Sequence, residues 1–252
     1  MSNSKIVIPQ RKKVFLILTD EGSATKSTIA DLIISGYRNA GKTIAKFDGD
    51  IQHQTTFKKY GDGTDNPITG CVPFDIETDN QIILNSIGID ADAILIDLPA
   101  RAVEITQNLF SDIETFYKAY EQFNCELNVV IPVVSDKSII SVNNIYNTVS
   151  SIDFEDTVRM LLIKNVGYMK FRNNLFEVNS LYEQAMKSIT NKGNLVIVEH
   201  DIKTVYDSKG ILEIQLKSAD INTVINSKQD ITTQVILGSI KNDIKQLHAK
   251  IS

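Results

Sequence analysis

The residues best suited to chemistry in this 252-residue chain lie in a polar segment that follows a short apolar run. The run 14–18 leads into the segment 20–28, and a helix-like pattern follows. Lys26, Ser27 and Thr28 at the start of a helix are typical of a phosphate-binding loop, because backbone N–H groups and a helix N-terminus attract phosphate oxygens. Lys26 would contact the β- and γ-phosphates, and the Ser27 hydroxyl would hold Mg²⁺. The alternative is a plain strand-to-helix turn in which a hydroxyl caps the helix.

Two acidic motifs follow other strand-like runs. Asp48 and Asp50 close the run 43–47, and Asp97 closes the run 93–96. A carboxylate at the end of an apolar strand can stand beside Mg²⁺ at the edge of a sheet. Asp48 and Asp50 point to opposite sides of a strand, so only one of them can face a nucleotide crevice. In isolation each motif also fits an ordinary turn, but their order after the lysine-containing loop favours a nucleotide site.

The elements that must position these residues alternate between strand-like and helix-like patterns. Six runs rich in Val and Ile predict strands buried on both faces, at 14–18, 43–47, 93–96, 127–134, 158–163 and 195–198. Helical stripes lie between them at 27–39, 104–123, 138–149 and 179–189, and an amphipathic closing helix is expected at about 229–251. This alternation predicts an α/β fold with a central, mostly parallel sheet flanked by helices, and the segment 62–79 is expected to be an irregular surface excursion.

Composition excludes several classes of protein. The chain is 42% hydrophobic and 23% charged, and it has no linker or repeat, so one domain over residues 1–252 is expected. The 26 basic and 31 acidic residues argue against a protein that coats nucleic acid through bulk charge, although a local basic patch remains compatible with them. No apolar run approaches the roughly 18 residues of a membrane span. Cys71 and Cys125 match no metal spacing, and together with the absence of a signal-like N-terminus they predict a cytoplasmic protein.

The motifs in this order resemble the ParA/MinD group of P-loop ATPases, which carry a deviant phosphate-binding box, Lys-Gly-Gly-x-Gly-Lys-Ser/Thr. The resemblance covers roughly residues 13 to 200. The matching segments are Asp48-Gly49-Asp50-Ile51-Gln52 against Asp-x-Asp-Pro-Gln, His53-Gln54-Thr55-Thr56 against Gly-Asn-x-Thr, Asp97-Leu98-Pro99 against Asp-x-Pro, the Pro132-containing strand, and Asn165 at a strand end. In size and style, plasmid stability and transfer proteins of the StbB/TraL kind are the most similar members.

The resemblance implies a single-domain P-loop NTPase fold, ATP and Mg²⁺ as cofactors, and a slow ATPase. The implied nucleotide-binding residues are Gly22, Ser23, Ala24, Thr25, Lys26, Ser27, Thr28 and, at the adenine, Asn165. Ser27 and Asp97 would serve the metal, and Asp50 and Lys26 would be catalytic, with Asp50 positioning the attacking water. The family also implies an ATP-dependent homodimer that binds a partner protein of a partition or transfer system, with non-specific DNA as a further partner.

Three departures from the family pattern favour an alternative, a non-hydrolysing scaffold of the same fold that acts through protein–protein contacts. Glu21 replaces the signature lysine, and Ser23 and Thr25 replace glycines. Glu21 would repel phosphate and disfavour a closed dimer, so Glu21→Lys is expected to strengthen ATP-dependent dimerisation. Thr25 is β-branched and resists the positive φ that glycine allows. A metal-cluster relative is less compatible with the sequence, because Cys125 is expected at the end of a helix, within the core.

Basic side chains for contact with DNA are few. The candidates are Arg11-Lys12-Lys13, Lys58-Lys59, Lys170 with Arg172 around Phe171, and Lys241 with Lys245. Most such pairs are ordinary solvated faces of a protein. Of the three histidines, only His53 is expected near the γ-phosphate.

Overall fold

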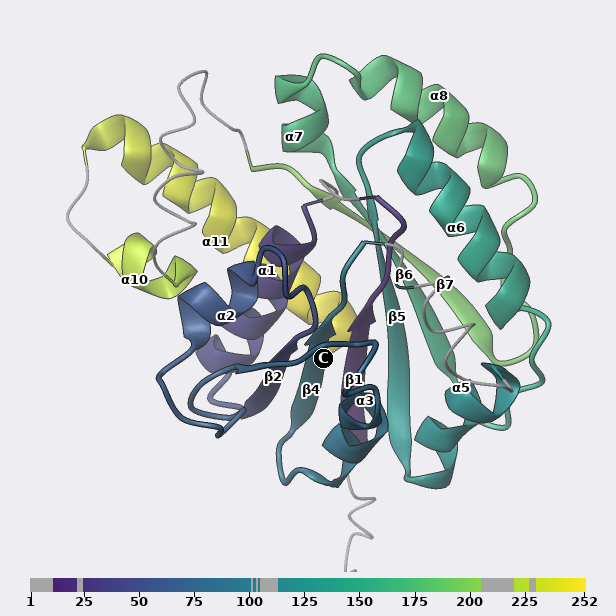
Figure 1. The fold of residues 1–252 in the computed structure, drawn as a ribbon. Coiled ribbons are helices and arrows are strands. Elements are labelled where there is room, and N and C mark those ends of the chain that lie inside the picture. Colours follow the sequence, from purple (N-terminus) through teal and green to yellow (C-terminus); the bar gives the residue numbers. More distant parts are fainter. Residues whose placement is uncertain are drawn as a thin grey trace, which may run out of the picture.

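A seven-stranded parallel sheet forms the centre of the computed structural model, which describes residues 11–21, 25–100, 102, 104, 113–204, 220–226 and 230–252. The strands are β1 (Lys12–Ile17), β2 (Ile44–Asp48), β3 (Val72–Pro73), β4 (Ala93–Asp97), β5 (Cys125–Val133), β6 (Val158–Asn165) and β7 (Leu195–Ile202). Their order across the sheet is β3-β2-β4-β1-β5-β6-β7 (Figure 1). The predicted α/β fold with a central parallel sheet flanked by helices is therefore confirmed.

Helices cover both faces of the sheet (Figure 1). They are α1 (Lys26–Asn39), α2 (Thr55–Tyr60), α3 (Gln81–Asn85), the 3₁₀ turn η1 (Ser86–Gly88), α5 (Ile113–Gln122), α6 (Asp136–Val149), α7 (Val166–Phe171), α8 (Leu175–Ala185), α10 (Ile221–Asn226) and α11 (Ile231–Ile251). One hydrophobic core joins the sheet to α1, α10 and α11, and a second joins it to α3, α5, α6 and α8.

The central strand β1 explains why the apolar runs do not alternate with polar residues. Val14 and Leu16 pack into one core, while Phe15 and Ile17 pack into the other, and all four are fully buried. β1 pairs with β4 on one side and with β5 on the other. A strand that is buried on both faces needs apolar side chains at every position, which is the pattern of this run.

The closing helix α11 is an integral part of the core. Its apolar residues pack against α1, and its last turn accepts a charge-assisted hydrogen bond, from Lys13 Nζ to the Ile251 carbonyl at 2.7 Å. Nearer the middle of the helix, the buried Asp243 carboxylate accepts hydrogen bonds from the backbone N–H groups of Lys203 and Thr204, which follow β7. The Lys13 ammonium is favourable at the last turn because the C-terminal end of a helix carries partial negative charge. Both polar contacts and apolar packing therefore hold α11 against the rest of the domain.

Two segments differ from the sequence expectation. The excursion 62–79 contains the short edge strand β3, and the buried Lys46 holds it by donating from Nζ to the Ile68 carbonyl at 2.6 Å. The sequence places Cys125 at the end of a helix, but in the structure it is the first residue of β5. The helix α5 already ends at Gln122, and Asn124 takes a positive φ of 55°. The residues 105–112 of the expected helix 104–123 lie outside the described part of the chain.

Within the described ranges, no helix is both long enough and apolar enough to cross a bilayer.

His200 on β7 should make the protein less stable in mild acid. Burial lowers the pKa of this side chain, and its Nε2 is buried with no hydrogen-bond partner within the described residues. The nearby charged groups are Lys250, Asp243, Asp201 and Lys203. Because the unfolded chain takes up a proton near pH 6.5 and the folded chain does so only at lower pH, stability falls as the pH drops through this window.

The measurement is the free energy of unfolding by urea at several pH values, for the wild type and His200→Leu. Relative to the wild type, His200→Leu should gain stability as the pH falls below 6.5, because it lacks the contribution of His200; the raised pKa of Asp48 acts in the opposite direction in both proteins. His53→Leu, at a largely exposed histidine, should show no such gain. The same slope in the wild type and the His200 variant would contradict the role of His200.

Candidate functional site

The three motifs meet at the carboxyl ends of β1, β2 and β4. Lys26 Nζ lies 3.9 Å from Asp50 Oδ2, and Ser27 Oγ donates a hydrogen bond to Asp97 Oδ2 at 3.4 Å. Asp97 stands in register with Ile17 at the end of β1 and with Asp48 at the end of β2. Parallel strands end at one edge of their sheet, and ligands of open α/β sheets bind at that edge.

Asp97 is one of two buried carboxylates of the site. The residue is 2% exposed, and its Oδ2 accepts hydrogen bonds from Thr56 Oγ1 at 2.7 Å and from Ser27 Oγ. Burial raises the pKa of this carboxyl, and the charge of Lys26 opposes the rise. Asp97 Oδ1 is buried and has no hydrogen-bond partner among the residues that the structure describes.

The donor set fits a hydrated Mg²⁺ ion. A hydroxyl at Ser27 and a carboxylate oxygen without a partner at Asp97 are hard oxygen ligands, and Mg²⁺ is commonly held by one or two such groups together with phosphates and water. No cluster of three or more His, Cys, Asp or Glu side chains suited to a metal occurs in the described ranges, so an all-protein metal cage is absent there.

Asp48 and Asp50 have different tasks. Asp48 is fully buried, and its two oxygens accept the backbone N–H groups of Asp50 at 3.0 Å and Phe57 at 2.8 Å. Burial and then the Asp97 charge raise the pKa of Asp48 to about 7. Asp48 thus shapes the loop and the start of α2, while Asp50 is the one of the pair that faces Lys26.

Thr25 adopts the backbone conformation of the glycine that it replaces. Its φ of 58° and ψ of 26° lie in the left-handed region, at the N-cap of α1. For a β-branched residue this costs about 1–2 kcal/mol. Thr25 Oγ1 accepts a hydrogen bond from Asn165 Nδ2 at 3.3 Å, which helps to hold the strained residue in place.

Asn165 is fully buried at the end of β6, and its amide is engaged at both ends. The Nδ2 group contacts Thr25, and Oδ1 accepts the N–H of Tyr168 at 3.0 Å, which caps α7. Its predicted contact with adenine stays a prediction and would require the amide to give up a contact with Thr25 or Tyr168.

Of the remaining predicted phosphate ligands, the structure describes only Thr28. Gly22, Ser23 and Ala24 lie outside the described residues. Thr28 belongs to the first turn of α1, where its N–H donates to the Thr25 carbonyl at 3.1 Å.

Thr56 and Ser135 were missed as functional residues by the sequence interpretation. Thr56 occupies the position of the threonine in the Gly-Asn-x-Thr segment of the family, so a signal for it was present. Ser135 contacts Glu21, whose Oε2 accepts the Ser135 hydroxyl at 2.6 Å, and no local pattern indicates a pair so distant in sequence.

A cavity of about 360 Å³ opens beside Asp50. It is lined by Gly49, Asp50, Ile51, Gln52, His53, Asp75, Ile76, Glu77, Pro99 and Ala100. His53 Nδ1 lies 3.4 Å from Asp50 Oδ1, so the histidine does stand next to the candidate catalytic carboxylate.

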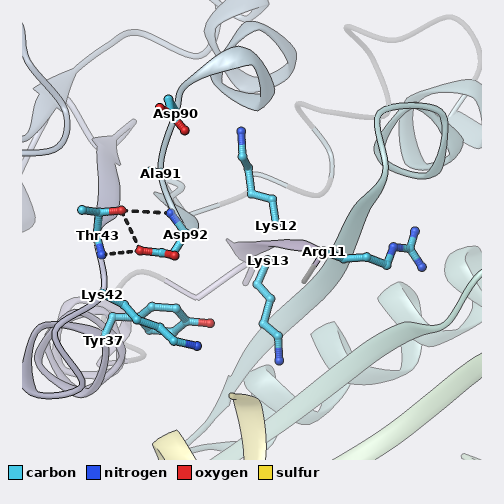
Figure 2. A pocket seen from close by; sticks show the side chains of 9 residues that line it. All are labelled: Arg11, Lys12, Lys13, Tyr37, Lys42, Thr43, Asp90, Ala91 and Asp92. Atoms are coloured by element: carbon cyan, nitrogen blue, oxygen red, sulfur yellow. Dashed lines mark hydrogen bonds between the residues drawn. The ribbon is translucent and has the colours of Figure 1, made fainter. Parts of the chain in front are cut away.

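A second cavity of about 510 Å³ lies at the amino ends of the strands. Arg11, Lys12 and Lys13 line it. Figure 2 shows that Lys12 and Lys13 point to opposite sides of β1 and that Arg11 points in a third direction. Arg11 pairs with Asp156 at 2.7 Å, and Lys12 Nζ donates to the Ile87 carbonyl at 2.7 Å. These side chains therefore anchor β1 to its surroundings and are not simply the solvated run of charge that the sequence suggested.

Comparisons with known proteins yield solved structures only. No protein-family model matches the chain, and no curated protein matches it by sequence. The MinD cell division protein of Aquifex aeolicus is 15% identical, with 91% of this chain and 95% of that chain covered and a TM-score of 0.44. A structure of the MinC:MinD cell division complex from the same organism is also 15% identical, with 91% of this chain and 94% of that chain covered and a TM-score of 0.44. A nucleotide-binding protein from Archaeoglobus fulgidus, in complex with ADP and with cobalt, is 16% identical over 81% of this chain and 86% of that chain, with a TM-score of 0.41.

Thr56→Val should destabilise the nucleotide-free protein by about 1–3 kcal/mol, because it removes the shorter of the two hydrogen bonds to the buried Asp97 carboxylate. The free energy of unfolding in urea is the measurement, with Thr55→Val as the matched control at a less buried neighbouring threonine. Equal effects of the two substitutions would show that the contact with Asp97 contributes nothing specific.

Proposed function

We propose that this chain is a P-loop ATPase of the ParA/MinD type that binds Mg·ATP at the carboxyl edge of β1, β2 and β4. The observation that carries the proposal is the meeting of Lys26, Ser27, Asp50 and Asp97 at that edge, with one buried Asp97 oxygen lacking a partner among the described residues. In the nucleotide-free protein Lys26 lies next to Asp50, and a phosphate group would offer it a stronger acceptor.

The proposed division of labour follows from the positions of the side chains. Lys26 would bind the β- and γ-phosphates, and Ser27 and Asp97 would hold the hydrated metal. Mg²⁺ supplies charge neutralisation at the phosphates when it is bound. Asp50, held by the turn that Asp48 organises, orients the water that attacks the γ-phosphate.

The cellular role that we propose is a slow, nucleotide-dependent switch in plasmid or chromosome partition, positioning or conjugative transfer. The switch works as an ATP-dependent homodimer that engages a partner protein, with DNA as a further partner. The order of the sequence motifs supports this role. The departures at Glu21, Ser23 and Thr25 favour the second candidate, a non-hydrolysing scaffold of the same fold that acts through protein–protein contacts.

Lys26→Ala should weaken Mg·ATP binding by about 10- to 100-fold, because a charge-assisted contact to phosphate contributes about 1.5–3 kcal/mol. Isothermal titration gives the affinity. Lys58→Ala is the control, since Lys58 is exposed and its Nζ donates only to the His53 carbonyl within the described residues. Unchanged affinity in the Lys26 variant, or no binding by the wild type at millimolar Mg·ATP, would contradict the proposed site.

Asp50→Asn should reduce the rate of ATP hydrolysis by about 100-fold while leaving Mg·ATP affinity within about threefold of the wild type, because a neutral amide offers the attacking water a weaker acceptor than a carboxylate and so orients it less well. Phosphate release under saturating ATP is the measurement. Asp75→Asn, in the wall of the same cavity, is the control. Binding by the wild type without turnover would favour the scaffold, and full turnover by the Asp50 variant would exclude the water-positioning role.

A further inference from the structure

The entry of the loop between β1 and α1 is fixed to α6 by side-chain contacts. The backbone N–H of Asp20 donates to Ser141 Oγ at 3.1 Å, and Glu21 Oε2 accepts the Ser135 hydroxyl at 2.6 Å. The N–H of Glu21 in turn donates to Thr19 Oγ1 at 3.1 Å. The first residues after β1 are thus attached to a helix that lies more than a hundred residues away in sequence.

Ser135 is well placed to bind a carboxylate. It is the N-cap of α6, and its Oγ accepts the N–H of Ser138 at 3.2 Å, so its own proton is free to be donated to Glu21. The N-terminus of a helix of 14 residues also attracts negative charge. Both effects favour a carboxylate at position 21, where the family has a cation.

The far end of the same loop has a comparable attachment. Thr25 holds its left-handed backbone conformation while its hydroxyl accepts the amide of Asn165. Glycine reaches such a conformation at no steric cost, and a threonine at the same position needs other constraints to hold it. Contacts from the carboxyl ends of β5 and β6 supply such constraints at both ends of this loop.

We propose that Glu21 is a positioning residue that holds the loop on the N-terminus of α6 through Ser135 and sets nucleotide affinity in this way. The proposal rests on the proposed nucleotide site. In this proposal Glu21 acts through Ser135 and not through its charge on the phosphates. A lysine at position 21 has no acceptor for the Ser135 hydroxyl, so the substitution breaks the attachment. Glu21→Lys therefore weakens the site, which is opposite to the expectation from the sequence.

A charge swap tests the attachment. Ser135→Asp keeps an N-cap residue on α6, since Asp caps helices as well as Ser does, but it places a carboxylate against Glu21. Glu21→Lys alone removes the acceptor. Each single substitution should weaken Mg·ATP binding by about tenfold in isothermal titration, and the double variant, which restores opposite charges, should return to within about threefold of the wild type.

Two further variants separate positioning from charge. Glu21→Gln keeps a side-chain acceptor for Ser135 and should bind Mg·ATP within about threefold of the wild type. Glu183→Lys makes the same change of charge at an exposed residue of α8 that does not line the cavity beside Asp50, and should have little effect. Tighter Mg·ATP binding by Glu21→Lys alone would overturn the proposal, because Glu21 would then act electrostatically on the nucleotide.

The melting temperature of the nucleotide-free protein keeps this test independent of ATP. The single substitutions should each lower it, and the double variant should recover most of the loss. Purely additive losses would overturn the attachment whether or not the protein binds ATP. Absence of Mg·ATP binding by the wild type, with recovery of the melting temperature in the double variant, would overturn the nucleotide site and the influence of Glu21 on affinity, and would leave only a structural attachment.

Discussion

Asp97 carries a carboxylate that is 2% exposed, and proteins tolerate a buried carboxylate only where donors and cations surround it. Here the donors come from two different segments, Ser27 at the start of α1 and Thr56 at the start of α2, with Lys26 close enough to affect the pKa of Asp97. The need to satisfy this one group therefore draws the beginnings of two helices to the end of β4. Asp48, its neighbour across the β2–β4 ladder, adds a second buried carboxylate and increases the demand for positive charge at this edge.

That demand gives the edge of the sheet its chemical character. Lys26 is the nearby cation, and it is only 3.9 Å from a further carboxylate, Asp50. A site that holds several acidic groups around one lysine is suited to a ligand that brings its own cation, such as a metal-bound phosphate. In the same arrangement both oxygens of Asp48 accept internal hydrogen bonds, whereas Asp97 uses only Oδ2 in this way and its Oδ1 has no partner among the described residues.

The loop that precedes α1 shows how a departure from a motif can be accommodated. Thr25 keeps the left-handed conformation that glycine would adopt freely, and Glu21 binds the N-cap of α6. Both changes depend on partners at the ends of the neighbouring strands, Asn165 after β6 and Ser135 after β5. At the opposite end of the sheet, Lys13 similarly joins β1 to the last turn of α11. The central strand is thus fixed at both of its ends by polar contacts with helices.

The sequence by itself determined the features that depend on local pattern. The doubly buried runs predicted the parallel sheet, because apolar side chains at successive positions require cover on both faces, and the polar residues after Leu18, Phe47 and Ile96 predicted one shared edge. Only the tertiary structure decided where individual side chains go. Glu21 and Ser135 are 114 residues apart, so their hydrogen bond cannot be read from sequence spacing, and the expectation that Glu21 would face phosphate came from the family pattern at this position. In the same way, Arg11, Lys12 and Lys13 form a basic run in sequence, but β1 directs them to different acceptors, since successive side chains of a strand point to opposite faces.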